Sequence, residues 1–378
     1  MKRILKKILR KIVLNLVGLI SYLNRLMIFD KVIYFSHHHV EGNIENLYAK
    51  RPGRVYLSKR CKKPIGQNIA DEDLYSLKKV FNYIPLICDL IFSRVIVLDD
   101  SLVALGAFNF SKKQRIIQVW HACGAFKKFG FASHHNTNKS ESIFKMYEKY
   151  SGVIVSSDEV RKHYAKSFSL GIDKIKALGV PRTDVFYNEE KINILRDSFF
   201  KTHPWLKGKK IFLYAPTYRK SEFIHKEAMD SISKIQEVLK ENEVLIYSLH
   251  PFDQDVIIQG LPENCNFTRN CDSNTLLLVA DVLITDYSSV IFEFSLMNKP
   301  MIFYSYDLES YVEEQRGFYY DYESFVPGPI AKDIDELKVI IDRDKYDYDQ
   351  ILSFKNMFMS ACDGHSTDRV VEYIDERK

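Results

Sequence analysis

The sequence predicts an α/β protein made of two doubly wound domains, each a parallel sheet covered by helices. Short apolar segments alternate with segments of helical periodicity along most of the 378 residues, a pattern typical of this fold class. Most of the apolar segments lack a polar face, as expected for parallel strands buried on both sides. The length is sufficient for two domains of ordinary size, and a polar segment at 188–210 marks the predicted boundary.

Residues 1–29 are predicted to form an amphipathic helix ahead of the first domain. Apolar residues recur on one helix face from Ile4 to Ile20. Basic residues on the other face precede Asp30, the first acidic residue of the chain: Lys2, Arg3, Lys6, Lys7, Arg10 and Lys11. No apolar run reaches the roughly 18 residues that a membrane-spanning helix requires. We therefore expect an in-plane helix on the anionic cytoplasmic face of a membrane, or alternatively a helix packed on the protein's own core.

The remaining elements are predicted from the apolar and helical patterns. In the N-terminal domain, residues 30–203, the predicted strands are 32–35, 55–57, 95–98, 116–120 and 152–156. In the C-terminal domain, residues 208–378, they are 211–214, 244–248, 266–268, 282–285 and 301–304. Helical patterns between the strands are clearest at 158–169, 227–241 and 274–280. Strands and helices thus alternate as a doubly wound fold requires.

The composition argues against several classes of protein. Six cysteines are scattered without a Cys-x-x-Cys pair, which suits a reducing compartment and not a disulfide scaffold or a zinc site. The net charge of +5 is modest, and the basic residues cluster on the first helix without interleaved aromatic residues, so nucleic-acid binding is not expected. The consecutive residues His37, His38 and His39 do not predict a metal site, because neighbouring side chains of an extended segment cannot converge on one ion.

The segment 281–300 combines a buried strand, a hydroxyl-rich turn and a helix. The strand residues 282–284 lead into the turn 285–289, and an amphipathic stretch then runs to Pro300. Backbone N–H groups and serine hydroxyls at such a helix start favour the binding of an anion. Glu293, about one turn further on, is placed to accept hydrogen bonds from a ribose. An ordinary serine N-cap on an αβ unit is the alternative.

Other polar motifs also follow predicted strands, at the sheet edge where open α/β sheets bind their ligands. They are His121 after 116–120, Arg182 in the turn 179–184, Thr217 and Arg219 after 211–214, His250 after 244–248, and Arg316 beside Gly317. Arginine and histidine together favour a polyanionic ligand, because guanidinium groups match phosphate geometry. A histidine at a strand end can act as a general base, although a single histidine is more often structural.

In this order the motifs resemble those of the CDP-glycerol glycerophosphotransferase family, whose members prime and polymerise teichoic acids and related capsules. The resemblance spans roughly residues 30–370. It is most specific at Thr285-Asp286-Tyr287-Ser288-Ser289, Lys299-Pro300, Phe303-Tyr304, Asp307 and Arg316-Gly317. It implies a GT-B architecture, in which two Rossmann-like domains face each other across a cleft and the C-terminal domain holds the nucleotide. It also implies peripheral attachment to the cytoplasmic face of the cell membrane.

The resemblance further implies transfer of a polyol phosphate, with glycerol phosphate expected, from a CDP-alcohol to an acceptor hydroxyl, with release of CMP. The donor would be CDP-glycerol or CDP-ribitol, and the acceptor a lipid-linked saccharide or a poly(polyol phosphate) chain at the membrane. No cofactor or metal is implied. His121 is expected to take the acceptor proton, and His250 to stabilise the leaving CMP, so these are the two expected catalytic residues.

The other site residues are assigned by the same resemblance. The expected donor-binding residues are Arg182, Thr217, Arg219, Thr285, Asp286, Ser288, Ser289, Glu293, Arg316 and Gly317. Those expected on the acceptor side are Gly124, Lys127 and Lys128. For Arg182 and Arg316, the interface between the domains is the alternative location. Phosphoryl transfer needs positioning and charge stabilisation more than covalent chemistry, which suits a site rich in cations and hydroxyls.

The chain departs from the family's pattern at three places. Trp120-His121-Ala122-Cys123-Gly124 stands where members often have Trp-His-Gly-Thr-Pro, which alters the acceptor-facing loop. Ser248 stands where many members have arginine, and Glu293 where aspartate is usual. Two rival interpretations use the same fold: a GT-B glycosyltransferase acting on a nucleotide sugar, and a non-catalytic scaffold at the membrane. Fold alone does not separate them from the family's activity, so the nucleotide of the donor is the discriminating observation.

Overall fold

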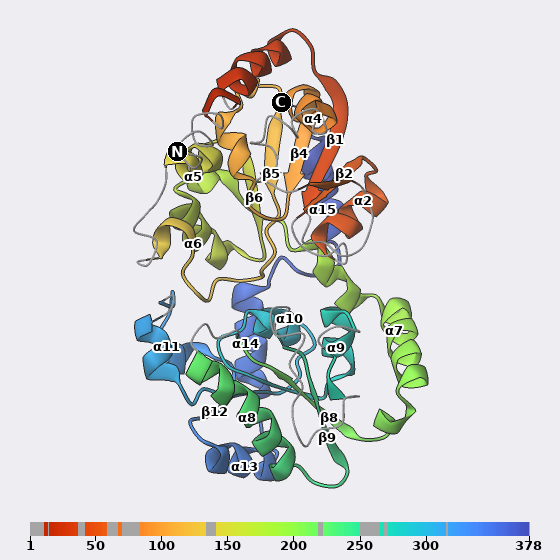
Figure 1. The fold of residues 1–378 in the computed structure, drawn as a ribbon. Helices are drawn as coiled ribbons and strands as arrows, with labels where there is room; N and C mark the ends of the chain where they lie inside the picture. Colours follow the sequence, from red (N-terminus) through yellow and green to blue (C-terminus); the bar gives the residue numbers. More distant parts are fainter. Residues whose placement is uncertain are drawn as a thin grey trace. The chain divides into compact units, whose positions relative to one another are not determined.

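The chain forms two compact units, each built around one parallel sheet. The computed structural model describes residues 11–13, 15–36, 42–58, 67–69, 84–133, 141–217, 222–249, 265–267, 271–314 and 317–377 (Figure 1). Unit 1 comprises Met1–Ala122, Phe129–Asp184 and Ala361–Lys378, and unit 2 comprises Cys123–Lys128 and Val185–Ser360. The predicted α/β class with parallel sheets is confirmed.

The sheet of unit 1 has the strand order β3-β2-β1-β4-β5-β6-β7, with parallel pairing throughout. Its strands are β1 (Phe29–Ser36), β2 (Arg54–Ser58), β3 (Gln67–Ile69), β4 (Ser93–Leu98), β5 (Arg115–Gln118), β6 (Gly152–Val155) and β7 (Ile175–Ala177). The order reverses between β1 and β4. Open α/β sheets bind ligands beyond the carboxyl ends of the strands at such a switch point, and in unit 1 the residues after β1, β4 and β5 occupy that position.

Helices from both ends of the chain complete the core of unit 1. The α-helices of unit 1 include α2 (Asn43–Lys50), α4 (Ile84–Phe92), α5 (Glu141–Glu148), α6 (Asp158–Phe168) and α15 (Ser366–Asp375). Short 3-10 segments are η1 (Ser21–Arg25), η4 (Val103–Ala107), η5 (Gly130–Ala132) and η6 (Ile172–Lys174), and η7 (Pro181–Tyr187) runs from unit 1 into unit 2. One apolar core joins side chains of β1, β2, β4, β5 and β6 to side chains of α2 and α15. Burial of each large apolar side chain contributes about 1.5–3 kcal/mol, which holds the C-terminal helix in unit 1.

The sheet of unit 2 has the strand order β12-β11-β10-β8-β9, again parallel. Its strands are β8 (Lys210–Ala215), β9 (Glu243–Tyr247), β10 (Val282–Thr285), β11 (Met301–Tyr304) and β12 (Ile330–Ala331). Its helices are α7 (Glu189–Thr202), η8 (Pro204–Leu206), α8 (Glu222–Val238), α9 (Ser273–Val279), α10 (Val290–Ser295), α11 (Leu308–Glu314), α12 (Tyr322–Phe325), α13 (Ile334–Arg343) and α14 (Tyr348–Phe358). The switch point lies between β8 and β10, because the chain adds β9 on one side of β8 and β10 on the other.

The division of the chain differs from the predicted one in three places. Unit 2 begins at Val185, earlier than the predicted boundary, because α7 packs against α9. The last segment, Ala361–Lys378, returns to unit 1, where α15 packs against α2. The short segment Cys123–Lys128 belongs to unit 2 although the residues on both sides of it belong to unit 1. The strand predicted at 266–268 is, within the described residues, a single bridge between Asn266 and Tyr247.

The N-terminal helical segment has two different faces. Residues 11–13 and 15–20 are helical and lead into η1. On the inner face Val13, Val17 and Ser21 are buried, and the Ser21 hydroxyl accepts a hydrogen bond from the backbone N–H of Asn109 at 2.8 Å. The opposite face leaves large apolar side chains exposed: Ile12, Leu16, Leu19, Ile20, Leu23, Leu26 and Met27. The basic residues before Lys11 lie outside the described residues. Among the helices that the structure describes, none has the length and apolarity needed to cross a membrane.

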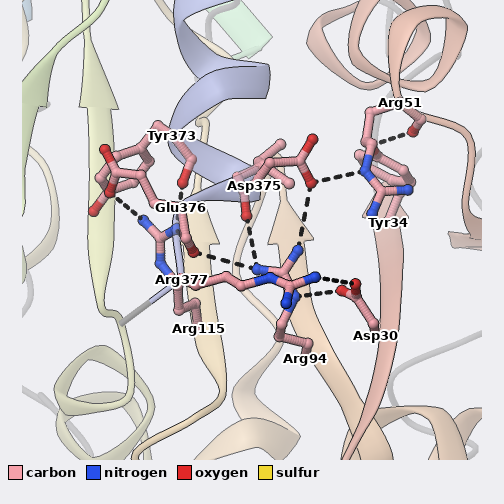
Figure 2. A network of polar contacts seen from close by, with 10 residues as sticks. Asp30, Tyr34, Arg51, Arg94, Arg115, Tyr373, Asp375, Glu376 and Arg377 are labelled. Carbon is pink, nitrogen blue, oxygen red and sulfur yellow. Dashed lines mark hydrogen bonds and ion pairs between the residues drawn. The ribbon is translucent and has the colours of Figure 1, made fainter.

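A network of charged groups fastens the end of α15 to the sheet of unit 1 (Figure 2). Arg94 of β4 pairs with Asp30 at 2.5 Å and donates to the carbonyl oxygen of Ile374 at 3.2 Å. Arg115 of β5 donates to the carbonyl oxygens of Tyr373 and of Glu376. Because these carbonyls belong to the end of α15, where backbone C=O groups lack helical partners, the guanidinium groups satisfy and anchor that end.

Candidate functional site

In unit 1, residues that follow three neighbouring strands meet at the switch point. Ser36 ends β1, Asp99 follows β4 and His121 follows β5. The Ser36 hydroxyl donates to the Asp99 carboxylate, and both residues are buried. His121 Nδ1 lies 3.2 Å from the backbone carbonyl oxygen of Asp99. Since a carbonyl only accepts, Nδ1 carries the proton in this hydrogen bond, which leaves Nε2 as the ring nitrogen able to take one.

The main chain around His121 has an unusual conformation. Trp120 has φ +54°, in the left-handed region that residues other than glycine rarely adopt. Its indole stacks on the His121 ring with centroids 4.4 Å apart, and on Phe129 with centroids 5.1 Å apart. The backbone N–H of Trp120 donates to the side-chain oxygen of Gln118 at 2.8 Å. Stacking of the indole on the imidazole, support of the indole by Phe129 and a backbone hydrogen bond therefore hold the imidazole in one place.

Arg182 engages the protein's own backbone. Its Nη1 donates to the carbonyl oxygen of His121 at 2.7 Å. Two residues later, the Asp184 carboxylate accepts hydrogen bonds from the backbone N–H groups of Ser366 at 3.0 Å and Thr367 at 2.8 Å, at the start of α15. The turn 179–184, predicted to face a phosphate or the other domain, therefore also connects the His121 turn with the returning C-terminal helix.

In unit 2, the ends of β8 and β10 are tied together across the switch point. The Asp286 carboxylate accepts the backbone N–H of Thr217 at 2.9 and 3.1 Å, and the Thr285 hydroxyl donates to the carbonyl of Ala215 at 2.7 Å. Asp286 is 1% exposed and Thr285 is fully buried. These two motif residues thus shape the ends of β8 and β10, and Thr217 and Ser288 beside them are half-buried.

The two serines of the motif are the accessible part of this turn. Ser288 and Ser289 are both half-buried and directly precede α10. Ser288 Oγ accepts the backbone N–H of Val290 at 3.4 Å, a weak capping contact. Glu293, on α10, is only 6% exposed. The arrangement places hydroxyls and backbone N–H groups at the carboxyl end of β10, and the binding of an anion there stays a prediction.

The buried side chain of Tyr287 anchors the motif to neighbouring residues of unit 2. Its hydroxyl donates to the Asp307 carboxylate at 2.9 Å, and its ring stacks on Tyr311 with centroids 4.0 Å apart. Burial, followed by the neighbouring carboxylates of Asp307 and Asp286, raises the pKa of Tyr287 above its ordinary value. The phenol therefore stays protonated and acts as a donor. The Tyr322 hydroxyl donates to the backbone carbonyl of Asp286 at 3.1 Å, which adds a second support.

The loop that follows His121 is built into unit 2. Phe126 stacks on Phe318 and Phe325 with ring centroids 5.0 and 4.8 Å apart. The adjacent Lys127 forms an antiparallel bridge with Phe318. Gly124 has φ +61°, and a Cβ there would overlap the ring of Phe292, so the close approach requires glycine.

The same pairing brings together two predicted site residues. The backbone N–H of Lys128 donates to the carbonyl of Gly317 at 2.8 Å. Gly124, Lys127 and Lys128, predicted on the acceptor side, are therefore grouped with unit 2, beside the predicted donor residue Gly317. The reason is the insertion of Phe126 into the aromatic cluster of unit 2, which alternation of apolar residues in the sequence does not reveal.

The side chain of Lys299, in the Lys299-Pro300 part of the motif, contacts backbone carbonyl groups. Its Nζ donates to the carbonyl oxygens of Leu278 at 3.0 Å and Ala280 at 2.6 Å, at the end of α9. Burial, together with the nearby charge of Arg196, lowers the pKa of Lys299 to about 8. A cation at a helix C-terminus stabilises the unpaired carbonyls there, so this lysine holds α9 against the loop before β11.

Several predicted residues lie outside the described residues: His250, Arg219 and Arg316, together with His37, His38 and His39. Within the part of the chain that is described, no group of three or more metal-binding side chains occurs. Three residues around the His121 turn belong to none of the predicted motifs: Ser36, Asn43 and Asp99. Asp99 could have been recognised, because it directly follows a predicted strand at the sheet edge where ligands bind.

Comparison with known proteins gives concordant results. A family model described as CDP-glycerol:poly(glycerophosphate) glycerophosphotransferase matches residues 26–376. The teichoic acid poly(ribitol-phosphate) polymerase of Bacillus spizizenii is 40% identical over 289 residues, 75% of this chain and 46% of that protein. The teichoic acid glycerol-phosphate primase of Bacillus subtilis is 33% identical over 318 residues, 82% of this chain and 81% of that protein. The chain thus spans less than half the length of the polymerase.

A solved structure agrees in fold. The structure of the wall teichoic acid polymerase TagF superposes with a TM-score of 0.76 at 22% sequence identity, covering 99% of this chain and 94% of that chain. At this identity the likeness concerns the fold. It places the two parallel α/β sheets of this chain in a GT-B-like architecture.

Proposed function

Because this chain belongs to the CDP-glycerol:poly(glycerophosphate) glycerophosphotransferase family, we propose that it transfers a polyol phosphate from a CDP-alcohol to a hydroxyl group of a teichoic acid or capsule acceptor. The observation that carries this proposal is the family match across residues 26–376, which includes both switch-point sites. The relatives act, by their names, in ribitol-phosphate and glycerol-phosphate chemistry. The polyol of the donor is therefore part of the proposal, with glycerol or ribitol as its two forms.

The proposed mechanism assigns one role to each switch point. An acceptor hydroxyl attacks the β-phosphorus of the CDP-alcohol, the bond from that phosphorus to the bridging oxygen breaks, and CMP leaves. Nε2 of His121 takes the proton of the attacking hydroxyl. Thr217, Ser288 and Ser289 in unit 2, with Arg219, His250 and Arg316 from outside the described residues, hold the diphosphate and stabilise the charge that develops on CMP. A GT-B arrangement, with both sites facing a common cleft, belongs to this proposal.

The donor specificity is tested by the nucleotide released. With a lipid-linked acceptor, the protein is expected to release CMP from CDP-glycerol or CDP-ribitol and to release no nucleotide from UDP- or GDP-sugars. Chromatography of the nucleotides measures the donor, and sizing of the lipid product distinguishes addition of one unit from addition of many. A comparable rate with a UDP-sugar would support a GT-B glycosyltransferase instead and overturn the proposal.

We further propose that the N-terminal helical segment attaches the protein to the cytoplasmic face of an anionic membrane. The exposed fractions of Leu19, Leu23 and Leu26 are 68%, 46% and 84%, although solvent-exposed leucines normally occur singly. The buried face of the same segment packs on unit 1, so the helix both belongs to the fold and presents an apolar surface. Arg25 lies beside this surface, as expected at a lipid headgroup region.

Replacing Leu19, Leu23 and Leu26 together with glutamine is expected to release most of the protein from anionic vesicles. Each buried leucine contributes about 1.5–3 kcal/mol to membrane transfer, so the triple substitution should lower the partition coefficient more than 100-fold. Flotation with phosphatidylglycerol-containing vesicles measures the bound fraction.

The control for this experiment is Ile194→Gln, which changes an equally exposed apolar residue on α7, with 60% of its surface accessible. This variant should float as the wild type does. The triple variant should still turn over a short soluble acceptor while losing activity on a membrane-embedded one. Unchanged flotation of the triple variant, or equal loss of activity on both acceptors, would contradict membrane attachment through this face.

A further inference from the structure

Three successive backbone carbonyls around His121 are held by two side chains from other parts of unit 1. The side-chain amide of Asn43, the first residue of α2, donates to the carbonyl oxygens of Val119 at 3.2 Å and Trp120 at 2.9 Å. Arg182 donates to the carbonyl oxygen of His121 at 2.7 Å. The two holding residues are themselves joined, because the backbone N–H of Arg182 donates to Asn43 Oδ1 at 3.0 Å.

The turn held in this way is strained. A left-handed conformation at a residue such as Trp120 costs about 1–2 kcal/mol, and it persists only where the surroundings over-determine it. Asn43 is 3% exposed. Its amide nitrogen donates to two carbonyl oxygens of the turn, and its amide oxygen accepts the backbone N–H of Arg182. Removing this amide leaves a buried carbonyl at Val119 and a partly buried one at Trp120 without that donor, and an unsatisfied buried carbonyl costs more than the average hydrogen bond contributes.

We propose that Asn43 is a positioning residue for the reaction: it imposes the left-handed turn at Trp120 and thereby aims the imidazole of His121. The inference rests on the proposed function only in taking His121 as the catalytic base. The ring itself is fixed by the hydrogen bond from Nδ1 to the carbonyl of Asp99 at 3.2 Å. With the main chain released, Nε2 moves relative to the acceptor hydroxyl, and a displacement of about 1 Å at a reacting group can cost about 10²-fold in rate.

The direct test is Asn43→Ala, with Asn43→Asp as a second variant that keeps the size and the acceptor but removes both donors. We expect kcat to fall about 10–100-fold in either variant, with the KM for the acceptor and the Kd for the CDP-alcohol unchanged, because the amide is buried and bonded to backbone groups. The matched control is Asn24→Ala. Asn24 of η1 is also a buried asparagine, 2% exposed, and its side-chain amide donates to the carbonyl oxygen of Asn109 at 2.5 Å. It makes no hydrogen bond to the His121 turn or to Arg182 in the part of the chain that is described, so its loss should leave kcat near the wild-type value.

A double-mutant cycle separates positioning from general support of the fold. If Asn43 acts through His121, Asn43→Ala should cost no further kcat in a His121→Ala background. An equal loss of kcat in both backgrounds, or an equal loss for Asn24→Ala, would overturn the inference. The two hypotheses fail in different ways. Wild-type turnover by the His121→Ala variant would refute His121 as the base. Wild-type turnover by Asn43→Ala, together with an inactive His121→Ala variant, would refute only the positioning role of Asn43.

Discussion

Replacing His121 with alanine is expected to lower kcat by about 10²–10⁴-fold, the range for loss of a general base. The reason is geometric: the Asp99 carbonyl holds Nδ1, so Nε2 is the ring nitrogen left to accept the proton of the acceptor hydroxyl. Binding of the CDP-alcohol should be nearly unchanged, because the proposed donor contacts at Thr217, Ser288 and Ser289 lie in unit 2. Steady-state CMP release and titration calorimetry of donor binding measure the two effects separately.

His365→Ala is a suitable control, because the side chain of His365 is 75% exposed at the start of α15 and is distant in sequence from every site motif. This variant should retain wild-type kcat. His250→Ala should differ from both, with losses of turnover and of donor binding, because its proposed partner is the diphosphate. Wild-type turnover by His121→Ala would show that another group is the base, and His37, His38 and His39 would be tested next.

Replacing Arg115 with alanine is expected to lower the free energy of unfolding of unit 1 by about 3 kcal/mol. The side chain of Arg115 is 3% exposed, donates to the carbonyls of Tyr373 and Glu376, and lies 4.2 Å from the centroid of the Tyr373 ring. Hydrogen bonds from a charged donor contribute about 1.5–3 kcal/mol each, and their loss leaves carbonyls at the end of α15 unsatisfied. Urea denaturation followed by circular dichroism measures the change, and trypsin sensitivity of the C-terminal segment should rise with it.

Lys50→Ala provides the comparison, because Lys50 at the end of α2 also contacts α15, through its ion pair with Asp368. Both of these side chains are about half exposed, and exposed ion pairs contribute less than about 1 kcal/mol. The Lys50 variant should therefore unfold within about 1 kcal/mol of the wild type. A loss as small for Arg115→Ala would show that α15 is held by its apolar face alone.

The sequence was sufficient to predict which polar residues follow the strands. Apolar runs without a polar face identified β4, β5, β8 and β10, and the carboxyl ends of parallel strands lie on one edge of a sheet. His121 therefore had to lie beyond the carboxyl end of β5, and Ser288 and Ser289 beyond the carboxyl end of β10. The family could be recognised from the same motifs because they occur in order after those strands.

The roles of individual motif residues were less predictable. Asp286 and Arg182 belong to motifs that point to a donor phosphate, yet Asp286 accepts the backbone N–H of Thr217 and Arg182 donates to the carbonyl of His121. Whether a charged side chain meets a ligand or a backbone group depends on its burial and on residues 60 or more positions away in the chain. Local sequence patterns carry no record of such contacts.

By itself the sequence determined the α/β class, the order of the strands along the chain and the family, because these depend on local periodicity and on motif order. Only the tertiary structure decided that Cys123–Lys128 joins unit 2 and that Ala361–Lys378 returns to unit 1. It also decided that Asn43 holds the turn before His121. Each of these depends on burial of apolar or polar groups against partners remote in sequence, such as Phe126 against Phe318, and that burial exists only once the chain has folded.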